Sequence, residues 1–284
     1  MSEKRKILLQ LDPDPQPSVF DRVVAIDAGV EELFSYGNVT PEQVQGLVHG
    51  AIFTRGPKDL HRTAIFIGGS KVEAGEALLK AALDAMLPQF GLRVSVLLDA
   101  NGANTTAAAA VRVAAKQLNL AGKTALVLGG TGPVGQRVGL LLAQQGAIVR
   151  LASRQQDRAS QACAAIAAKL PGAILQPVAG DLQRMTTGVQ LIVAAGAAGV
   201  VLLPRDARPA GLEMLIDLNA VPPLGIEGVE ATDKDTQRDG IVCYGALGVG
   251  DTKMKLHRRA IAALFERNDA VLDAREVYAL GESL

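Results

Sequence analysis

One segment of the chain constrains its fold more than any other: a glycine-rich turn between an apolar strand and a helix. Residues 124–128 (TALVL) have the composition of a buried strand, and residues 134–145 have the apolar spacing of a helix. Between them, Gly130, Gly132 and Gly135 form the pattern G-x-G-x-x-G. A turn of this kind brings backbone N–H groups and the positive end of a helix dipole to one point. The segment therefore predicts a dinucleotide-binding site of the Rossmann type.

Each glycine of this turn has its own expected role. Gly130 permits the tight turn, Gly132 lets the backbone approach a pyrophosphate, and Gly135 allows close packing of the helix on the sheet. Pro133 is expected at the first helical position, where its missing N–H costs nothing. A tight turn that binds no ligand is the alternative. The expected cofactor-binding residues of the turn are Gly130, Thr131, Gly132, Pro133, Val134 and Gly135.

The end of the next predicted strand distinguishes NADP from NAD. Sites for NAD place an acidic residue there to bind the ribose 2′-hydroxyl, whereas this chain has Ser153 and Arg154. The arginine offers a charge-assisted fork to a 2′-phosphate, and the serine offers a further donor. Asp157 is expected to begin the following helix instead. We therefore expect NADP as the cofactor, with Arg158 either beside the phosphate or solvated.

A second segment of small residues follows another predicted strand. It contains Ala195 and Gly196, within the sequence AAGAAG at residues 194–199. Small residues at this point would let the nicotinamide end of a cofactor lie against the backbone. A flexible turn is the alternative.

Strands and helices alternate along almost the whole chain, which predicts βαβ units and parallel sheets. A length of 284 residues fits about two domains. The pattern restarts after Gly122, so we expect an N-terminal α/β domain and a second, Rossmann-type NADP domain with a parallel sheet, separated by an interdomain cleft. We expect residues 1–120 with 251–284 to form the substrate and catalytic domain. Residues 121–250 are expected to form the NADP domain.

The individual elements follow from short apolar runs and from apolar residues at helical spacing. Thr40 is expected to cap a helix that begins at Pro41. The predicted strands are 7–11, 23–26, 63–67, 93–98, 124–128, 148–152, 174–178, 191–195 and 214–218. The predicted helices are 41–53, 72–87, 104–118, 134–145, 157–170, 253–267 and 274–281, with residues 222–239 as a loop.

Charge and composition exclude several classes of protein. Lys and Arg number 29 and so do Asp and Glu, so the chain lacks the basic footprint of a nucleic-acid-binding protein. No apolar stretch is long enough to predict a membrane span, and the run at residues 7–11 is too short for a signal peptide. Two distant cysteines, Cys163 and Cys243, predict free thiols and a cytoplasmic protein.

The sequence contains few of the residue patterns that are typical of catalytic or metal sites. The three histidines, His49, His61 and His257, have no metal-ligand spacing, so we expect no metal site. The sequence has neither a G-x-S-x-G elbow nor a P-loop. Hydride transfer needs few protein groups because the cofactor supplies the chemistry, so the inventory fits an oxidoreductase. The basic run at residues 253–259 is expected to form a solvated helix face, or to point one lysine into the cleft.

Seven segments taken together resemble one family. Jointly they are similar to the NADP-dependent methylene-tetrahydromethanopterin and methylene-tetrahydrofolate dehydrogenases of bacterial one-carbon metabolism. The resemblance covers essentially the whole chain. The segments are PSVFD (17–21), YGNVTPE (36–42), TAIFIGG (63–69), DANGANTTAAA (99–109), GGTGPVG (129–135), NAVPPLGIEG (219–228) and GALGVGDTKMKLHR (245–258).

The resemblance implies hydride transfer from a methylene-tetrahydropterin to NADP, which gives the methenyl form. It implies tetrahydromethanopterin as the first choice of carrier and tetrahydrofolate as the second. It places the pterin in the interdomain cleft, Lys253 at the catalytic site and Asn219 beside the nicotinamide. Turn formation and helix capping are the alternatives for the polar residues that it assigns to the substrate. These substrate-binding residues are Asp21, Asp99, Asn101, Asn104 and Thr105.

Two other functions stay open at this point. One is a different dehydrogenase on the same two-domain plan, such as a shikimate-type enzyme, although the lysine context of that family is missing. The other is a non-catalytic module that senses NADP. The Tyr-x-x-x-Lys pair of the bifunctional folate dehydrogenase–cyclohydrolases is also missing, so we expect no cyclohydrolase activity. The expected partner is a small tetrahydropterin, with no nucleic acid and no membrane, and we expect a homo-oligomer.

Overall fold

The computed structural model describes residues 3–283, which divide into two compact units. Unit 1 contains the chain up to Thr105 and again from Met254 onward. Unit 2 contains residues Thr106–Lys253. The chain passes from one unit to the other within two helices, α4 (Ala103–Gln117) and α8 (Ala246–Ala263).

Unit 1 is built on a five-stranded sheet in the order β12-β4-β3-β1-β2, in which every pair of strands is parallel. Strand β3 is buried along its full length, as its continuous apolar sequence requires for a strand covered on both faces. The strands are β1 (Ile7–Leu11), β2 (Glu32–Tyr36), β3 (Thr63–Ile67), β4 (Ser95–Leu98) and β12 (Val271–Leu272).

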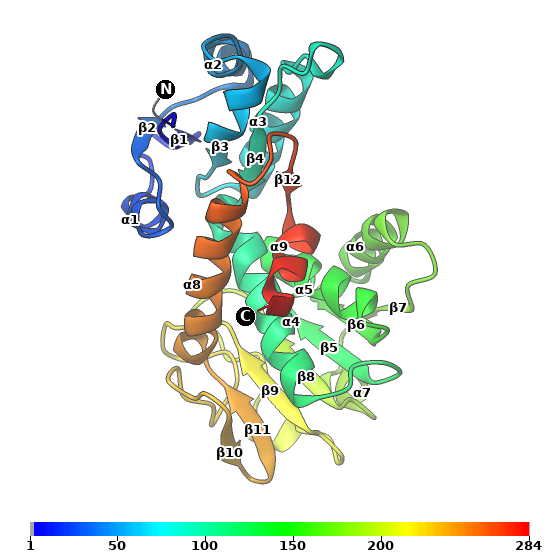
Figure 1. Cartoon of the computed structure of the whole chain (residues 1–284). Coiled ribbons are helices and arrows are strands. Elements are labelled where there is room, and N and C mark those ends of the chain that lie inside the picture. The colour runs from blue at the N-terminus through cyan, green and yellow to red at the C-terminus, as the bar shows by residue number, and fades with distance from the viewer. Residues whose placement is uncertain (1–2, 284) are drawn as a thin grey trace. The chain divides into compact units, whose positions relative to one another are not determined.

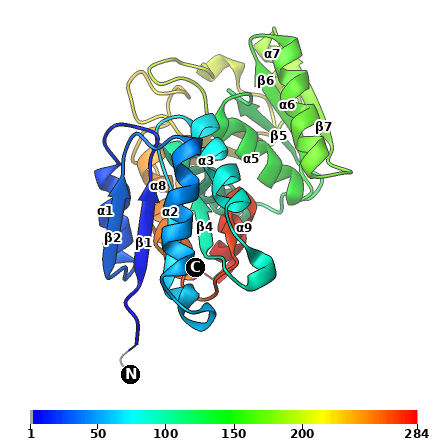
Figure 2. The ribbon, with the colours of Figure 1, turned by 90° about the horizontal axis from the view of Figure 1, so that it is seen from above.

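Helices cover both faces of this sheet. The connection from β1 to β2 runs in the opposite direction to the connections from β2 to β3 and from β3 to β4. Right-handed crossovers therefore place α1 on one face and the pair α2 and α3 on the other, as Figures 1 and 2 show. The helices are α1 (Val19–Asp27), α2 (Pro41–Phe53), α3 (Val72–Asp84) and, near the C-terminus, α9 (Ala274–Leu280).

Unit 2 is built on a seven-stranded sheet in the order β10-β11-β9-β8-β5-β6-β7. Six strands are parallel in the order of a dinucleotide-binding sheet, and β10 adds an antiparallel edge. The strand order reverses between β5 and β8. The strands are β5 (Thr124–Leu128), β6 (Ile148–Ser153), β7 (Leu175–Ala179), β8 (Leu191–Ala194), β9 (Met214–Asp217), β10 (Thr236–Arg238) and β11 (Ile241–Tyr244).

The glycine-rich turn lies at that point of reversal, directly after the central strand β5. It leads into α5 (Pro133–Gln144), and α6 (Gln156–Lys169) follows β6. The two helices pack against each other and against β6. A short helix, α7 (Leu182–Thr186), precedes β8. Since ligands of such sheets bind at the carboxyl ends of the strands beside the reversal, this topology predicts where a cofactor binds.

Within residues 3–283, none of the helices is both long and apolar enough for a membrane span.

The sequence predicted the main elements well. The strands at residues 7–11, 63–67 and 124–128 and the helix at 41–53 have the predicted bounds. Most other boundaries move by one to three residues. The exception is α8, which begins at Ala246 rather than at residue 253 and ends at Ala263 rather than at residue 267.

The predicted strand at residues 23–26 is wrong. These residues lie inside α1, which begins after Ser18, whose hydroxyl accepts a hydrogen bond from the N–H of Asp21. Only Val24 and Ala25 of this helix are buried, so the apolar run reflects a largely exposed helix face rather than a strand. The strand of this region is β2, which the sequence analysis missed, because its residues are mixed and only partly buried. Strand β10 likewise lies within the predicted loop at 222–239.

Candidate active site

The glycine-rich turn is held by close backbone contacts that exclude larger side chains. Gly129 has a φ of +73°, and a Cβ atom there would lie 2.5 Å from the Cα of Gly196. Gly130, by contrast, packs on β6, where a Cβ atom would lie 3.0 Å from the Cα of Leu151. The role expected of Gly130 in the tight turn therefore belongs to Gly129, the residue just before the G-x-G-x-x-G pattern.

The first turn of α5 completes a cradle for phosphate. Gly132 caps the helix and Pro133 is its first residue, one position before the predicted start. A Cβ atom on Gly135 would collide with the carbonyl oxygen of Gly129, so this glycine allows the helix to approach the turn itself. At Gly132, a Cβ atom would lie 3.4 Å from the carbonyl oxygen of Gly129, which is an ordinary van der Waals contact. The backbone geometry therefore fits a pyrophosphate group at a helix N-terminus.

Thr131 and Val134, the other two predicted residues of the turn, are half-buried. The carbonyl oxygen of Thr131 accepts a hydrogen bond of 2.8 Å from the side-chain amide of Gln136, which fixes the turn to the second turn of α5.

The end of β6 carries the residues that were predicted to select the cofactor. Ser153 is the last residue of the strand and is half-buried, and the exposed Arg154 follows it. The Ser153 hydroxyl accepts the N–H of Gln155 at 3.3 Å. Asp157 lies in the first turn of α6, as expected, and Arg158 is exposed on the same helix. The guanidinium of Arg154 is therefore accessible to an anionic group.

Ala195 and Gly196 follow β8 and lie beside the glycine-rich turn. The N–H of Ala195 donates to the carbonyl oxygen of Leu128 at 2.8 Å, and Gly196 contacts Gly129 as described above. The backbone at Gly196 is thus packed closely against the turn, in addition to any contact with a cofactor.

Asn219 lies in the loop after β9, and its side chain is bound within that loop. Its amide nitrogen donates to the carbonyl oxygens of Val221 (3.1 Å) and Pro223 (3.2 Å), and its amide oxygen accepts the N–H of Val221 at 2.9 Å. The side chain therefore shapes the loop that follows β9.

In unit 1, three of the predicted substrate-binding residues are bonded to one another. Asp99 directly follows β4, and its Oδ1 accepts the N–H groups of Asn104 and Thr105, both at 3.0 Å. Its Oδ2 accepts the Thr105 hydroxyl at 2.6 Å, and the Asn104 amide donates to the carbonyl oxygen of Leu98 at 2.5 Å. All three side chains are buried. The side chain that caps the first turn of α4 is thus the carboxylate of Asp99 and not the amide of Asn104.

Asn101 differs from these three residues. It is exposed and has a φ of +54°, in the short turn between β4 and α4. A positive φ is uncommon outside glycine, although asparagine tolerates it better than most residues. The buried bonds around Asp99 hold this turn in place, so that Asn101 is presented to solvent at the carboxyl end of the sheet.

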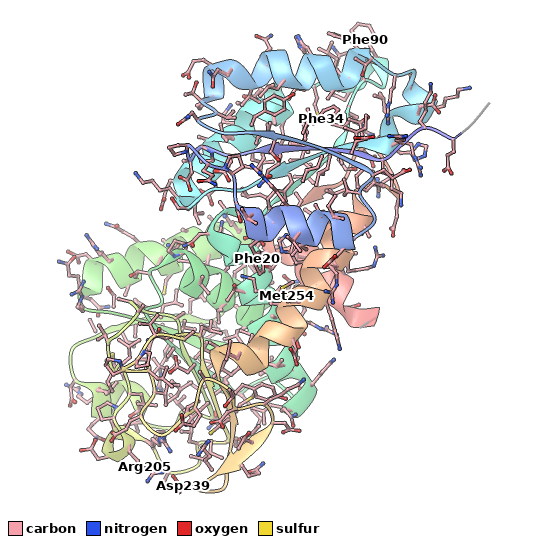
Figure 3. The ribbon with its side chains drawn as sticks, turned by 90° about the vertical axis from the view of Figure 1, so that its left-hand side faces the viewer. Phe20, Phe34, Phe90, Arg205, Asp239 and Met254 are labelled. Atoms are coloured by element: carbon pink, nitrogen blue, oxygen red, sulfur yellow. The ribbon has the colours of Figure 1, made fainter. Side chains whose placement is uncertain are left out.

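Asp21 lies in the first turn of α1 and faces α8. Its Oδ1 is 3.9 Å from Nε2 of His257, and its side chain is 15% exposed. The imidazole of His257 is buried and stacks on Phe66 of β3, with 5.7 Å between ring centroids, and it also contacts Phe20 of α1. Figure 3 labels Phe20 on α1 and Met254 on the neighbouring α8. Asp21 is thus a partly accessible carboxylate beside a buried imidazole.

The sequence analysis missed two buried polar residues of unit 1, His257 and Asp12. His257 was assigned to a solvated basic face, but Ala260, Ile261 and Leu264 follow it at helical spacing and are buried with it. That spacing was a usable signal. Asp12 follows β1 as Asp99 follows β4, and it is also buried.

Burial raises the pKa of Asp12 above its usual value. The N–H groups of Asp14 (2.9 Å) and Ser18 (3.4 Å) donate to the Asp12 carboxylate and oppose this shift. These bonds fix the start of the loop that leads from β1 to α1.

Lys253, the predicted catalytic residue, is half-buried on α8, one helical turn before His257. The next lysine, Lys255, is exposed. The residues at 253–259 therefore do not form a uniformly solvated face.

Comparisons with known proteins agree with this arrangement. Residues 19–101 match a family model described as methylene-tetrahydromethanopterin dehydrogenase, N-terminal. The chain is 44% identical to the bifunctional protein MdtA of Methylorubrum extorquens, over 99% of both chains. It is 33% identical to an NAD(P)-dependent methylenetetrahydromethanopterin dehydrogenase of the same organism, over 97% of both chains.

Among solved structures, the fold is similar to that of the ligand-free 5-ketofructose reductase of Gluconobacter sp. strain CHM43. The TM-score is 0.56, with 17% sequence identity and 99% of each chain covered. At this identity the likeness shows the fold alone.

The fold and the glycine-rich turn define a two-unit α/β protein whose second unit has a sheet of the dinucleotide-binding type. The identities over nearly full length then define the family. The chain belongs to the methylene-tetrahydromethanopterin dehydrogenases, and it is an enzyme of that family.

The bonds around Asp99 give a testable prediction for stability. Thr105→Val keeps the shape of the side chain but removes the hydroxyl that donates to Oδ2, so the variant should lose about 1.5–3 kcal/mol of unfolding free energy. Denaturant unfolding monitored by circular dichroism measures this loss. The matched control is Thr106→Val, at the next, half-buried position, which should stay within about 0.5 kcal/mol of the wild type. Equal stability of the two variants would contradict the role given to Asp99.

Proposed function

We propose that this enzyme oxidises methylene-tetrahydromethanopterin to the methenyl form with NADP, as a step of one-carbon metabolism. The observation that carries the proposal is the phosphate cradle of unit 2, with Arg154 exposed beside it, in a chain that matches the family over nearly its full length. Tetrahydrofolate is the second choice of carrier.

In this proposal unit 2 binds the cofactor. The N–H groups of the turn at residues 130–135 bind the pyrophosphate, and Ser153 and Arg154 bind the 2′-phosphate. Ala195, Gly196 and the loop that begins at Asn219 lie beside the nicotinamide half. NADP bound there would supply the acceptor for the hydride that leaves the methylene carbon.

Unit 1 binds the pterin in this proposal. Asp21 and Asn101 are the predicted residues with accessible polar atoms, and Asp99, Asn104 and Thr105 hold the turn that presents Asn101. Loss of a hydride leaves a delocalised cation on the one-carbon unit, so a carboxylate such as Asp21 stabilises the charge that develops. No proton leaves the substrate, so the residues serve to orient it rather than to act as a base.

We further propose that the enzyme works in the cytoplasm as a homo-oligomer. Cys163 and Cys243 are both free and buried, which agrees with a reducing compartment.

The first experiment follows the absorbance of reduced nicotinamide with purified enzyme, NADP or NAD, and methylene-tetrahydromethanopterin or methylene-tetrahydrofolate. We expect turnover with NADP and methylene-tetrahydromethanopterin. The absence of turnover in all four combinations would contradict the proposal and favour a different dehydrogenase or a non-catalytic NADP sensor.

Arg154→Ala tests the choice of cofactor. The variant loses a charge-assisted fork to the 2′-phosphate, so KM for NADP should rise about tenfold or more while kinetics with NAD stay unchanged. Steady-state kinetics with both cofactors measure this difference.

The matched control is Lys169→Ala, which removes a cation from the last turn of α6, the helix that follows Arg154. It should leave both KM values unchanged. An Arg154→Ala variant with an unaltered KM for NADP would assign selectivity to other residues, of which Arg158 is the next to test.

Lys253→Met tests the predicted catalytic lysine. Methionine keeps the length and burial of the stem but removes the ammonium group, so kcat/KM for the methylene carrier should fall at least tenfold while KM for NADP changes little. Lys255→Met, at the exposed position on the same helix, is the control and should behave as the wild type. Equal activity of the two variants would remove Lys253 from the active site.

A further inference from the structure

A buried carboxylate at the end of β9 is unused by the function proposed above. Asp217 is the last residue of β9, and its exposed fraction is 0%. Burial raises the pKa of Asp217 above its usual value, and backbone N–H groups that donate to the carboxylate oppose the shift. A buried carboxyl group is costly unless it is well hydrogen-bonded. The hydrogen bonds that the Asp217 carboxylate accepts from backbone N–H groups therefore account for its buried position.

Asp217 closes the loop at residues 219–226, which we call the β9 loop. Its Oδ1 accepts the N–H of Asn219 at 3.0 Å, at the start of the loop, and its Oδ2 accepts the N–H of Ile226 at 2.8 Å, at the end. The N–H of Gly225 also donates to the carboxylate. A Cβ atom on Gly225 would lie 2.9 Å from Oδ1, so the loop is pressed against the carboxylate. One side chain thus joins both ends of the loop.

The β9 loop in turn contacts the segment that follows β8. The carbonyl oxygen of Gly225 accepts the N–H groups of Leu202 (2.8 Å) and Leu203 (3.0 Å). Leu203 also forms a parallel bridge with Ile226, and both side chains are fully buried. The loop is therefore fixed to the segment at residues 195–203.

Leu202 extends these contacts to the glycine-rich turn. A Cβ atom on Gly196 would lie 2.6 Å from Cδ1 of Leu202, and one on Gly129 would lie 2.5 Å from the Cα of Gly196. Packing is thus continuous from Asp217 through Gly225, Leu202 and Gly196 to Gly129. All of these residues belong to unit 2.

We propose that Asp217 is a positioning residue of the dinucleotide site. It fixes the β9 loop and, through Leu202, the segment at Ala195 and Gly196 against the glycine-rich turn, so that these segments form a rigid wall for the nicotinamide half of the cofactor. Asp217 itself does not touch the cofactor. The inference rests on the proposed function only in taking unit 2 as the nicotinamide-dinucleotide unit.

The test is a fluorescence titration with NADPH, which requires no pterin and no turnover. Asp217→Asn keeps the shape of the side chain but replaces one acceptor oxygen with an N–H₂ donor, which would face the N–H groups of the loop. We expect Kd for NADPH to rise tenfold or more. In steady-state assays of the same variant, KM for NADP should rise while KM for the methylene carrier changes less than twofold.

A matched control separates positioning from general loss of stability. Asp233 is another buried aspartate of unit 2, and it binds the N–H of Glu230 and the guanidinium of Arg238, on a different loop. Asp233→Asn should lower the Tm without changing Kd for NADPH. If Asp217→Asn lowers the Tm but binds NADPH as the wild type does, or if both variants weaken binding equally, Asp217 only stabilises the fold and the inference is wrong.

A second variant tests the route through Leu202. Leu202→Ala removes the side chain that contacts Gly196, and we expect Kd for NADPH to rise at least threefold. When the two changes are combined, the increase should be smaller than the product of the single increases, because both interrupt the same series of contacts. Independent effects would overturn the inference. Leu202→Ala alone still decides the matter if Asp217→Asn does not fold, since an unchanged Kd would contradict the route.

The outcomes also separate this inference from the proposed function. A wild-type enzyme that binds NADPH but oxidises no methylene carrier contradicts the proposed reaction, and the titrations of the variants still decide the role of Asp217. A wild type that binds neither NADPH nor NADH overturns both.

Discussion

Three loops at the carboxyl ends of parallel strands depend on one recurring interaction, a buried aspartate that binds backbone N–H groups of the segment after its own strand. Asp12 follows β1, Asp99 follows β4 and Asp217 ends β9, and the exposed fraction of each is 2% or less. A chain that leaves a buried strand carries N–H groups that no sheet partner satisfies, and leaving such groups unpaired costs free energy. The carboxylates meet this requirement and fix each loop.

This constraint determines which polar atoms are left for a ligand. In unit 1, Asp99 binds Asn104 and Thr105, so that Asn101 is the exposed member of its turn. In unit 2, the close contact of Gly129 with Gly196 brings the segment after β8 to the phosphate cradle. Rigid loops of this kind hold reacting groups in place before the substrate binds, which is how an enzyme with few catalytic side chains gains rate.

Much of the fold could be predicted because its signals are local. Buried parallel strands such as 63–67 and 124–128 are continuous apolar runs, and Thr40 followed by Pro41 marks a helix start. The prediction failed where the pattern was ambiguous. Residues 23–26 form an apolar run on a helix whose face is mostly exposed, and β2 is a partly buried strand at the edge of its sheet.

The sequence by itself determined the family, through the seven segments that resemble it. It also determined the tight turn between β5 and α5, because the spacing of Gly130, Gly132 and Gly135 between a strand and a helix is a local geometric requirement. Only the tertiary structure decided the role of each polar residue. It assigned the positive φ to Gly129, paired Asp21 with a buried His257, and bound Asp99 to the helix that follows it. The pairing of Asp21 with His257 depends on which atoms from distant segments come close together, and residue spacing along the chain does not encode that.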